Sequence, residues 1–274
     1  MEIYQGIVLG ILQGLTEFLP VSSSGHLVLG QLFFGITESV LSFDISVHMG
    51  TLVAVLVVYR RDILAMLASL TAFGIGSGDR SPAAFMADEN RRLALWIIVG
   101  SVPTALAGLF IKRFEHLLFS SAPLVGCMLI LTGLILWFSR RFYGNRPGQV
   151  SMDAKRALCI GLVQGCAVIP GVSRSGSTIS AGLALGLDRD RAARFSFLLS
   201  IPAIVGAQIL SFKDTWGQGL VIDPATICGT IVSFVTGLIA LKLLLKLVHT
   251  GKFHLFAPYC WGVGLLVLLS NLVA

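Results

Sequence analysis

The chain has 274 residues, of which 55% are hydrophobic and only 12% charged, and its mean hydropathy is +0.87. Several uncharged windows of about 18–20 residues are long enough to cross a bilayer, which excludes a soluble globular fold. The formal net charge of +6 does not indicate nucleic-acid binding, because the basic residues gather at the ends of the apolar segments. The sequence therefore predicts an all-α, polytopic, single integral membrane domain over residues 1–274.

The apolar segments predict two broken helix pairs and about six full transmembrane helices. The N-terminus lacks the basic region of a cleaved signal peptide, so we take the first segment as part of the fold. In chain order we expect a broken pair over about 3–34, a span over 43–59, a short interfacial helix over 62–73, a Gly/Ser-rich loop over 74–82, spans over 93–111 and 121–139, a second broken pair over 156–187, and spans over 194–212, 225–247 and 256–273.

The two broken pairs are copies of one sequence. The segments GILQG (10–14) and VSSSG (21–25) recur 151 positions later as GLVQG (161–165) and VSRSG (172–176). Each arm has about 12–16 residues, which is short for a full crossing, so we expect re-entrant hairpins broken near residues 19–24 and 170–175. The alternative is two ordinary pairs of spans. Broken helices at repeated positions favour a binding site inside the membrane.

The number of spans between the hairpins predicts their relative orientation. Three spans separate them, so the hairpins open to opposite sides and the repeats, approximately 1–111 and 152–247, are inverted. One side of the membrane then collects sixteen Lys and Arg residues and the other collects three, Lys112, Arg113 and Lys213. The positive-inside rule places the larger group in the cytoplasm. Both termini and the 112–120 loop are expected outside, the 140–155 loop inside, and the hairpin tips near the midplane.

The two tips carry the residues that point to chemistry. Arg174 is the one Lys or Arg outside the span ends, and Arg at the centre of a membrane helix costs about 2.5–3.5 kcal/mol on insertion scales. Two helix N-termini that converge there would bind an anion, and phosphate suits both them and a guanidinium fork. The structural alternatives are an Arg174–Glu17 ion pair that locks the hairpins together, and serines that only cap helices.

The copies differ at three aligned positions. Glu17 aligns with Val168, Ser23 with Arg174, and His26 with Ser177. An acid, a hydroxyl and an imidazole in one copy, set against a guanidinium in the other, indicate a division between chemistry and phosphate binding.

The run QGLTEFLPVSSSGH (13–26) resembles the first signature of the bacterial undecaprenyl-pyrophosphate phosphatase, or bacitracin-resistance, family. The runs PGVSRSGST (170–178) and FSFLLSIP (195–202) look like two further family stretches. The resemblance covers essentially the whole chain. It implies hydrolysis of undecaprenyl pyrophosphate to the monophosphate, a divalent cation (Mg²⁺ or Ca²⁺), and a site that faces the periplasm from the inner membrane. Some relatives carry Glu where this chain has Gln13, so Glu17 would lack a second carboxylate.

We therefore predict that Glu17, Ser23, His26 and Arg174 are catalytic. Ser23 is the favoured nucleophile, activated by His26 or Glu17, and direct attack by water is the alternative; Glu17 is also the candidate metal ligand. The substrate-binding candidates are Gln13, Ser22, Ser24, Gly25, Ser173, Ser175, Gly176 and Thr178. His48, at the head of a span, is expected to be interfacial, and a position near the site is the alternative.

The expected partners are a polyprenyl diphosphate lipid and the surrounding membrane lipid, with no nucleic acid. A transporter or flippase of a phosphate-bearing lipid is the alternative function, because it would share inverted repeats and broken helices. The Ser-Gly-His sequence at 24–26 also resembles the type 2 phosphatidate phosphatases, but this chain lacks the histidine that follows the Ser-Arg pair in that family.

Overall fold

The computed structural model describes residues 1–36, 41–75, 78–114, 118, 121–142, 150–214 and 223–273, which form helices and include no strand. The helices are α1 (Ile3–Phe18), α2 (Ser23–Phe33), α3 (Leu41–Val58), α4 (Arg60–Ile75), α5 (Pro82–Ala87), α6 (Glu89–Lys112), α8 (Ala122–Ser139), η1 (Arg140–Phe142), α9 (Ala154–Cys166), α10 (Arg174–Ala184), α11 (Arg189–Asp214), α12 (Pro224–His249), η2 (Phe253–Phe256) and α13 (Ala257–Val273).

The spans agree with a multi-pass membrane protein. Within the described ranges, five helical segments are long and apolar enough to cross a bilayer, and they lie in α6, α8, α11, α12 and α13. The sixth predicted span corresponds to α3, whose apolar stretch Ser42–Val58 is shorter. Along α12, Ile227, Ile231, Val235 and Ile239 recur every four residues and are each about half exposed. Such an apolar stripe on a hydrophobic helix is suited to contact with lipid.

Both predicted helix breaks are present. Helix α1 ends at Phe18 and α2 begins at Ser23, while α9 ends at Cys166 and α10 begins at Arg174. At each break a serine caps the second helix: Ser22 Oγ accepts from the Gly25 N–H at 3.4 Å, and Ser173 Oγ accepts from the Gly176 N–H at 3.1 Å. The capping interpretation of these two serines is therefore confirmed, and each satisfies a backbone donor that the helix start leaves unpaired.

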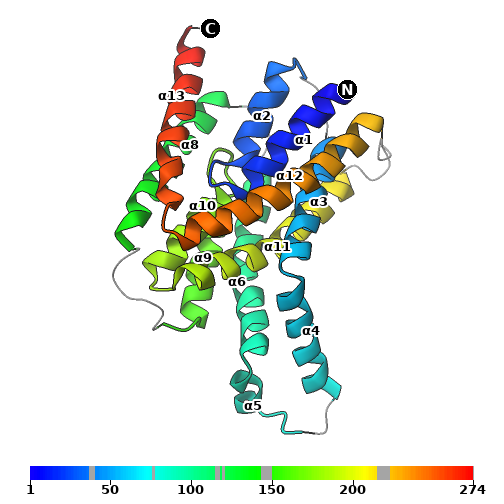
Figure 1. The fold of residues 1–274 in the computed structure, drawn as a ribbon, viewed down its shortest axis with the longest axis vertical. Helices are drawn as coiled ribbons and strands as arrows, with labels where there is room; N and C mark the ends of the chain where they lie inside the picture. The colour runs from blue at the N-terminus through cyan, green and yellow to red at the C-terminus, as the bar shows by residue number, and fades with distance from the viewer. Residues whose placement is uncertain are drawn as a thin grey trace.

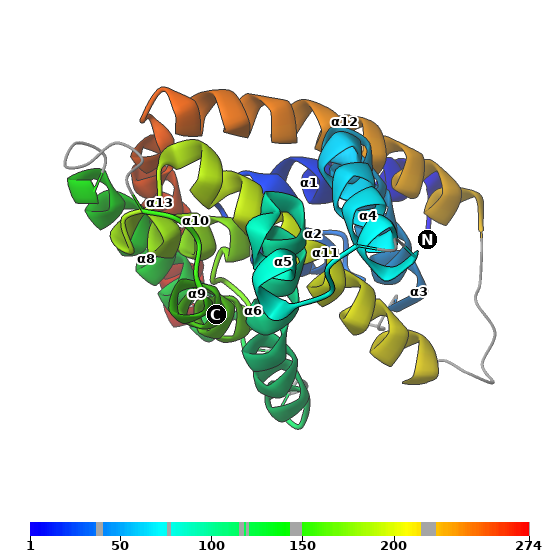
Figure 2. The same ribbon diagram turned by 90° about the horizontal axis from the view of Figure 1, so that it is seen from below.

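Each hairpin packs on a span from the other half of the chain. Figure 2 shows α1 beside α12 along one side of the molecule and α9 beside α6. The helix backbones touch at glycines: a Cβ on Gly10 would come 2.4 Å from the Gly229 oxygen, and one on Gly161 would come 2.0 Å from the Gly100 oxygen. Gly10 and Gly161 are equivalent in the duplicated sequence, so the packing repeats with the sequence. The inverted relation of the two halves stays a prediction.

The hairpin tips meet between the two ends of the molecule. Figure 1 shows α1 and α2 above α9 and α10, with both chain termini at one end and α4 and α5 at the other. Across the tips, the Gly171 N–H donates to Ser22 Oγ at 3.1 Å and the Ser175 hydroxyl donates to the Phe18 oxygen at 2.9 Å. The fully buried Phe18 ring packs edge-on against Phe197 of α11, with centroids 6.0 Å apart. The tips are therefore anchored to each other and to the hydrophobic core.

Candidate active site

A cavity of about 670 Å³ lies where the two tips meet. Its wall is formed by both tips together with α3, α6 and α11. It extends along α6 to Lys112, the end of that helix remote from α5, and along α11 to Ser211. Six of the predicted site residues line the cavity: Glu17, Ser22, Ser23, Ser24, Ser173 and Arg174.

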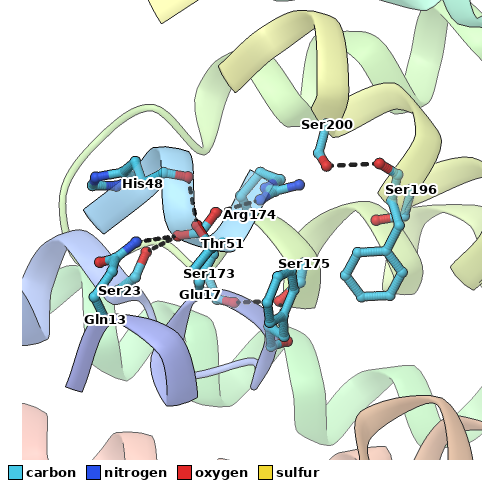
Figure 3. Close-up of polar contacts among 12 residues, drawn as sticks. Gln13, Glu17, Ser23, His48, Thr51, Ser173, Arg174, Ser175, Ser196 and Ser200 are labelled. Atoms are coloured by element: carbon cyan, nitrogen blue, oxygen red, sulfur yellow. Dashed lines mark hydrogen bonds and ion pairs between the residues drawn. The ribbon is translucent and has the colours of Figure 1, made fainter. Parts of the chain in front are cut away.

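Glu17 is the centre of the polar contacts in this cavity, as Figure 3 shows. One carboxylate oxygen, Oε2, accepts from the Ser23 hydroxyl at 2.6 Å and from Gln13 Nε2 at 3.1 Å. The other, Oε1, accepts from Arg174 Nη2 at 2.6 Å. The Glu17 side chain is 6% exposed, and each of its partners is a donor, as a buried carboxylate requires.

Arg174 joins the second hairpin to the first. Its ion pair with Glu17 spans the two tips, and its side chain is 16% exposed. The ion pair between Arg174 and Glu17, which was the structural alternative in the sequence analysis, is therefore present. Within the described residues, Arg174 Nη1 is buried and has no hydrogen-bond partner. Arg174 also lines the cavity, and the 16% of its side chain that is exposed leaves it able to meet an anion bound there.

The starts of two helices border the same cavity. Ser22 to Ser24 belong to the start of α2, and Ser173 and Arg174 belong to the start of α10. Helix N-termini present unpaired N–H groups and partial positive charge, which favour phosphate. The combination of two such termini, hydroxyls and a guanidinium group indicates a site for a phosphate-bearing ligand.

The other six predicted residues do not line the cavity. Both ring nitrogens of His26 are engaged, Nδ1 with the Ser22 carbonyl at 2.9 Å and Nε2 with the Tyr259 hydroxyl at 2.8 Å. The structure therefore does not present His26 to Ser23 as a base, and Glu17 holds that position. The Ser175 hydroxyl is bonded to the Phe18 carbonyl.

The other four are engaged in packing, capping or hydrogen bonds with neighbouring residues. The Thr178 hydroxyl donates to the Arg174 carbonyl at 2.7 Å and contacts the Ser196 hydroxyl. A Cβ on Gly25 would come 3.1 Å from Val125, and one on Gly176 would come 3.0 Å from Ser173 Oγ. Gln13 is fully buried and reaches the site only through its hydrogen bond to Glu17.

Two polar residues that the sequence did not single out, Gln31 and Asp44, lie on the cavity wall together with His48. Gln31 Nε2 donates to Asp44 Oδ1 at 2.7 Å. His48 Nδ1 lies 2.7 Å from the Asp44 carbonyl. Of the two positions considered for His48, the structure shows the one near the site, on the cavity wall. Asp44 and His48 are four residues apart, which puts them on one face of a helix. That spacing was the available signal.

The site provides a hydroxyl nucleophile, a base within hydrogen-bond reach and a guanidinium group. A divalent cation fits a one-carboxylate ligand set, because Mg²⁺ is commonly held by one or two carboxylates together with substrate phosphates. Glu17 and the nearby serine hydroxyls would supply the protein oxygens. In the part of the chain that the structure describes, no group of three or more His, Cys, Asp or Glu residues is placed to hold a metal ion. The substrate phosphates would therefore supply the remaining ligands.

Comparison with known proteins agrees with this chemistry. The model of the bacitracin resistance protein BacA family matches residues 6–266. The chain is 55% identical to the undecaprenyl-diphosphatase of Desulforapulum autotrophicum over the full length of both chains. It is 56% identical to that of Desulfosudis oleivorans, covering 96% of this chain and 97% of the relative. The undecaprenyl-diphosphatase of Korarchaeum cryptofilum is 42% identical over 98% of this chain and 99% of its own.

Proposed function

The chain belongs to the bacitracin resistance protein BacA family, and from this premise we propose how it hydrolyses undecaprenyl diphosphate to undecaprenyl phosphate. The phosphatase prediction is confirmed by the family and by relatives that match over the full chain. The observation that carries the mechanism is the 2.6 Å hydrogen bond from the Ser23 hydroxyl to Glu17, whose other carboxylate oxygen holds Arg174.

In the first step Ser23 Oγ attacks the terminal phosphorus of the diphosphate. Glu17 takes the proton of the Ser23 hydroxyl. The bond between the terminal phosphorus and the bridging oxygen breaks, and its electron pair leaves with undecaprenyl phosphate. Glu17 then passes its proton to this leaving group and is a carboxylate again. Arg174 and the helix starts of α2 and α10 stabilise the negative charge, because catalysis of phosphoryl transfer depends mainly on positioning and electrostatics. The product of this step on the protein is phosphoserine at position 23.

In the second step a water molecule attacks the phosphorus of the phosphoserine. Glu17 takes the proton of the water and returns it to Ser23 Oγ as the O–P bond breaks, which releases inorganic phosphate. Glu17 suits both steps, since it accepts from the serine hydroxyl and also lines the cavity from which the water would attack. The chain thus returns to its starting state.

We include Mg²⁺ or Ca²⁺ in this proposal. Glu17, serine hydroxyls and the two phosphate groups would hold the cation, which supplies neutralisation of phosphate charge when bound. The residues of the chain still carry out the proton transfers and the nucleophilic attack.

Phosphate release tests the activity and the cation together. We expect purified protein in detergent to release phosphate from undecaprenyl diphosphate, to lose the activity in EDTA, and to regain it with Mg²⁺ or Ca²⁺. Farnesyl diphosphate in parallel tests whether a shorter polyprenyl chain suffices. Full turnover in EDTA would contradict the cation, and lipid movement across vesicles without phosphate release would favour the transporter alternative.

We propose that the cavity opens to the outside of the inner membrane. The cavity extends to Lys112 and Ser211, which lie at the ends of α6 and α11 on the side that collects only three basic residues. The positive-inside rule makes that side the periplasm. The polyprenyl diphosphate would then be hydrolysed where carrier lipid is released after envelope polymers are assembled outside the cell.

Cysteine labelling tests this topology. In a background without the five native cysteines, Glu2→Cys should react with an impermeant thiol reagent added to intact cells. Ala83→Cys in α5 should react only after the membrane is disrupted, because α5 belongs to the side rich in Lys and Arg. The reverse pattern would contradict the orientation. Arg146, in the 140–155 loop that is expected inside, lies outside the described residues, so Ala83 serves as the inside position.

A further inference from the structure

Helix α13 reaches the first hairpin through a contact between Tyr259 and His26. The Tyr259 hydroxyl lies 2.8 Å from His26 Nε2, and the two rings stack with centroids 5.7 Å apart and planes 11° from parallel. His26 is 6% exposed, whereas Tyr259 is 48% exposed. The buried imidazole of His26 is therefore held in place by the half-exposed Tyr259.

The other nitrogen of His26 holds the backbone of Ser22. His26 Nδ1 lies 2.9 Å from the Ser22 carbonyl oxygen, and because a carbonyl only accepts, Nδ1 carries the proton. The neutral ring then accepts from the Tyr259 hydroxyl at Nε2. Ser22 has φ +70° and is the one non-glycine residue of the described ranges with a positive φ. Such a conformation is strained for a side-chain-bearing residue and persists only where its surroundings enforce it.

The equivalent turn of the second hairpin has neither the imidazole nor the strained backbone. Ser173, the counterpart of Ser22, has an ordinary φ of −74°. Ser177 stands in place of His26, and its buried hydroxyl has no hydrogen-bond partner within the described residues. The strained turn and the imidazole therefore occur together in the hairpin that carries Ser23, and both are missing from the equivalent turn.

We infer that Tyr259 is a positioning residue for the phosphatase reaction: it orients His26, which holds the strained carbonyl of Ser22 and so keeps Ser23 on Glu17. Ser22 directly precedes Ser23, and a change in the dihedral angles of Ser22 would swing the Ser23 hydroxyl off the carboxylate that it contacts at 2.6 Å. The inference rests on Ser23 as the nucleophile of the proposed function. It gives α13, which is remote in sequence from both signature motifs, a part in catalysis.

Removing one oxygen atom tests the inference. Tyr259→Phe should lower kcat for undecaprenyl diphosphate by about tenfold and leave KM unchanged, because small errors in the position of a reacting group reduce turnover without weakening ground-state binding. Tyr4→Phe is the matched control: Tyr4 is 59% exposed on α1, lies outside the cavity wall, and should keep wild-type turnover.

Two His26 variants separate positioning from proton transfer. The amide nitrogen of His26→Asn can replace Nδ1 as a donor to the Ser22 carbonyl, so this variant should stay within about tenfold of wild type. His26→Gln places its amide nearer the position of Nε2 and should lose about a hundredfold or more. The pH profile of kcat in His26→Asn should match that of wild type, since the ring is not the proton carrier.

Wild-type turnover in Tyr259→Phe would overturn the inference. So would an equal loss in His26→Asn and His26→Gln together with the disappearance of one limb of the pH profile. If His26→Asn does not fold, the comparison of Tyr259→Phe with Tyr4→Phe decides alone. Ser23→Ala in the same assay separates the two claims: full turnover there defeats the proposed nucleophile, whereas wild-type turnover in Tyr259→Phe defeats only the positioning role.

Discussion

Ser23→Ala should leave the protein folded and lower its turnover by about a thousandfold or more, because no other hydroxyl is held against Glu17 in the described structure. The substitution removes one oxygen from a half-buried side chain, so the packing of the hairpin tips is retained. Turnover should be measured as phosphate release at saturating undecaprenyl diphosphate, with thermal unfolding in detergent measured beside it.

Ser24→Ala is the matched control for this experiment. Ser24 is the next residue of the same helix turn and lines the same cavity, but its hydroxyl contacts Ser22 Oγ at 3.4 Å rather than Glu17. We expect its loss to be modest, as for a residue that only assists binding. If Ser23→Ala kept more than about a tenth of wild-type turnover, a covalent role for Ser23 would be excluded and direct attack by water would take its place.

The second large effect is expected at Arg174. Arg174→Ala should abolish turnover, and Arg174→Lys should still lose about tenfold to a hundredfold, because lysine keeps the charge but cannot donate from Nη1 and Nη2 in one plane. Both variants should be compared with wild type in phosphate release and in thermal stability. Near-normal turnover in Arg174→Lys would contradict a forked contact with phosphate.

Stability and turnover measured together separate this catalytic role from a purely structural one. Removing one partner of a buried ion pair lowers the free energy of unfolding by about 3–5 kcal/mol. Because the Arg174 side chain is 16% exposed, we expect a smaller loss when its pair with Glu17 is broken. Arg174→Ala should therefore unfold more readily than wild type, and the double variant Glu17→Gln/Arg174→Ala should recover stability. Recovery of turnover in the double variant would contradict the catalytic roles of both Arg174 and Glu17.

Most of the fold could be predicted from the sequence because its signals are local. The apolar segments, the prolines at the breaks and the serine caps each act within a few residues, and apart from the short α5, which was not predicted, the α-helices occur where these signals placed them. The meeting of Glu17, Ser23 and Arg174 was also predictable, since the internal repeat aligns the two tips. Charge buried in an apolar segment needs a partner, and here the partner lies on the opposite tip.

The orientation of individual side chains could not be predicted in the same way. His26 is three residues beyond Ser23, which turns it about 60° around the helix axis, and only the position of α13 decides that it faces Tyr259 rather than the cavity. Ser175 and Thr178 likewise turn toward the core. His48 could not be assigned to the site from the sequence, because the sequence does not show which face of α3 borders the cavity. These choices depend on contacts between helices that are far apart in the chain.

The most direct test of the account is to trap the covalent intermediate. Undecaprenyl diphosphate labelled in its terminal phosphate should be mixed with the protein, quenched in acid within a single turnover, and the peptides analysed by mass spectrometry. The mechanism predicts labelled phosphate on Ser23 and none in Ser23→Ala, and Glu17→Gln should slow both the formation and the hydrolysis of the phosphoserine. Turnover at the wild-type rate with no phosphate on the protein at any time, or with the label on a different residue, would contradict it.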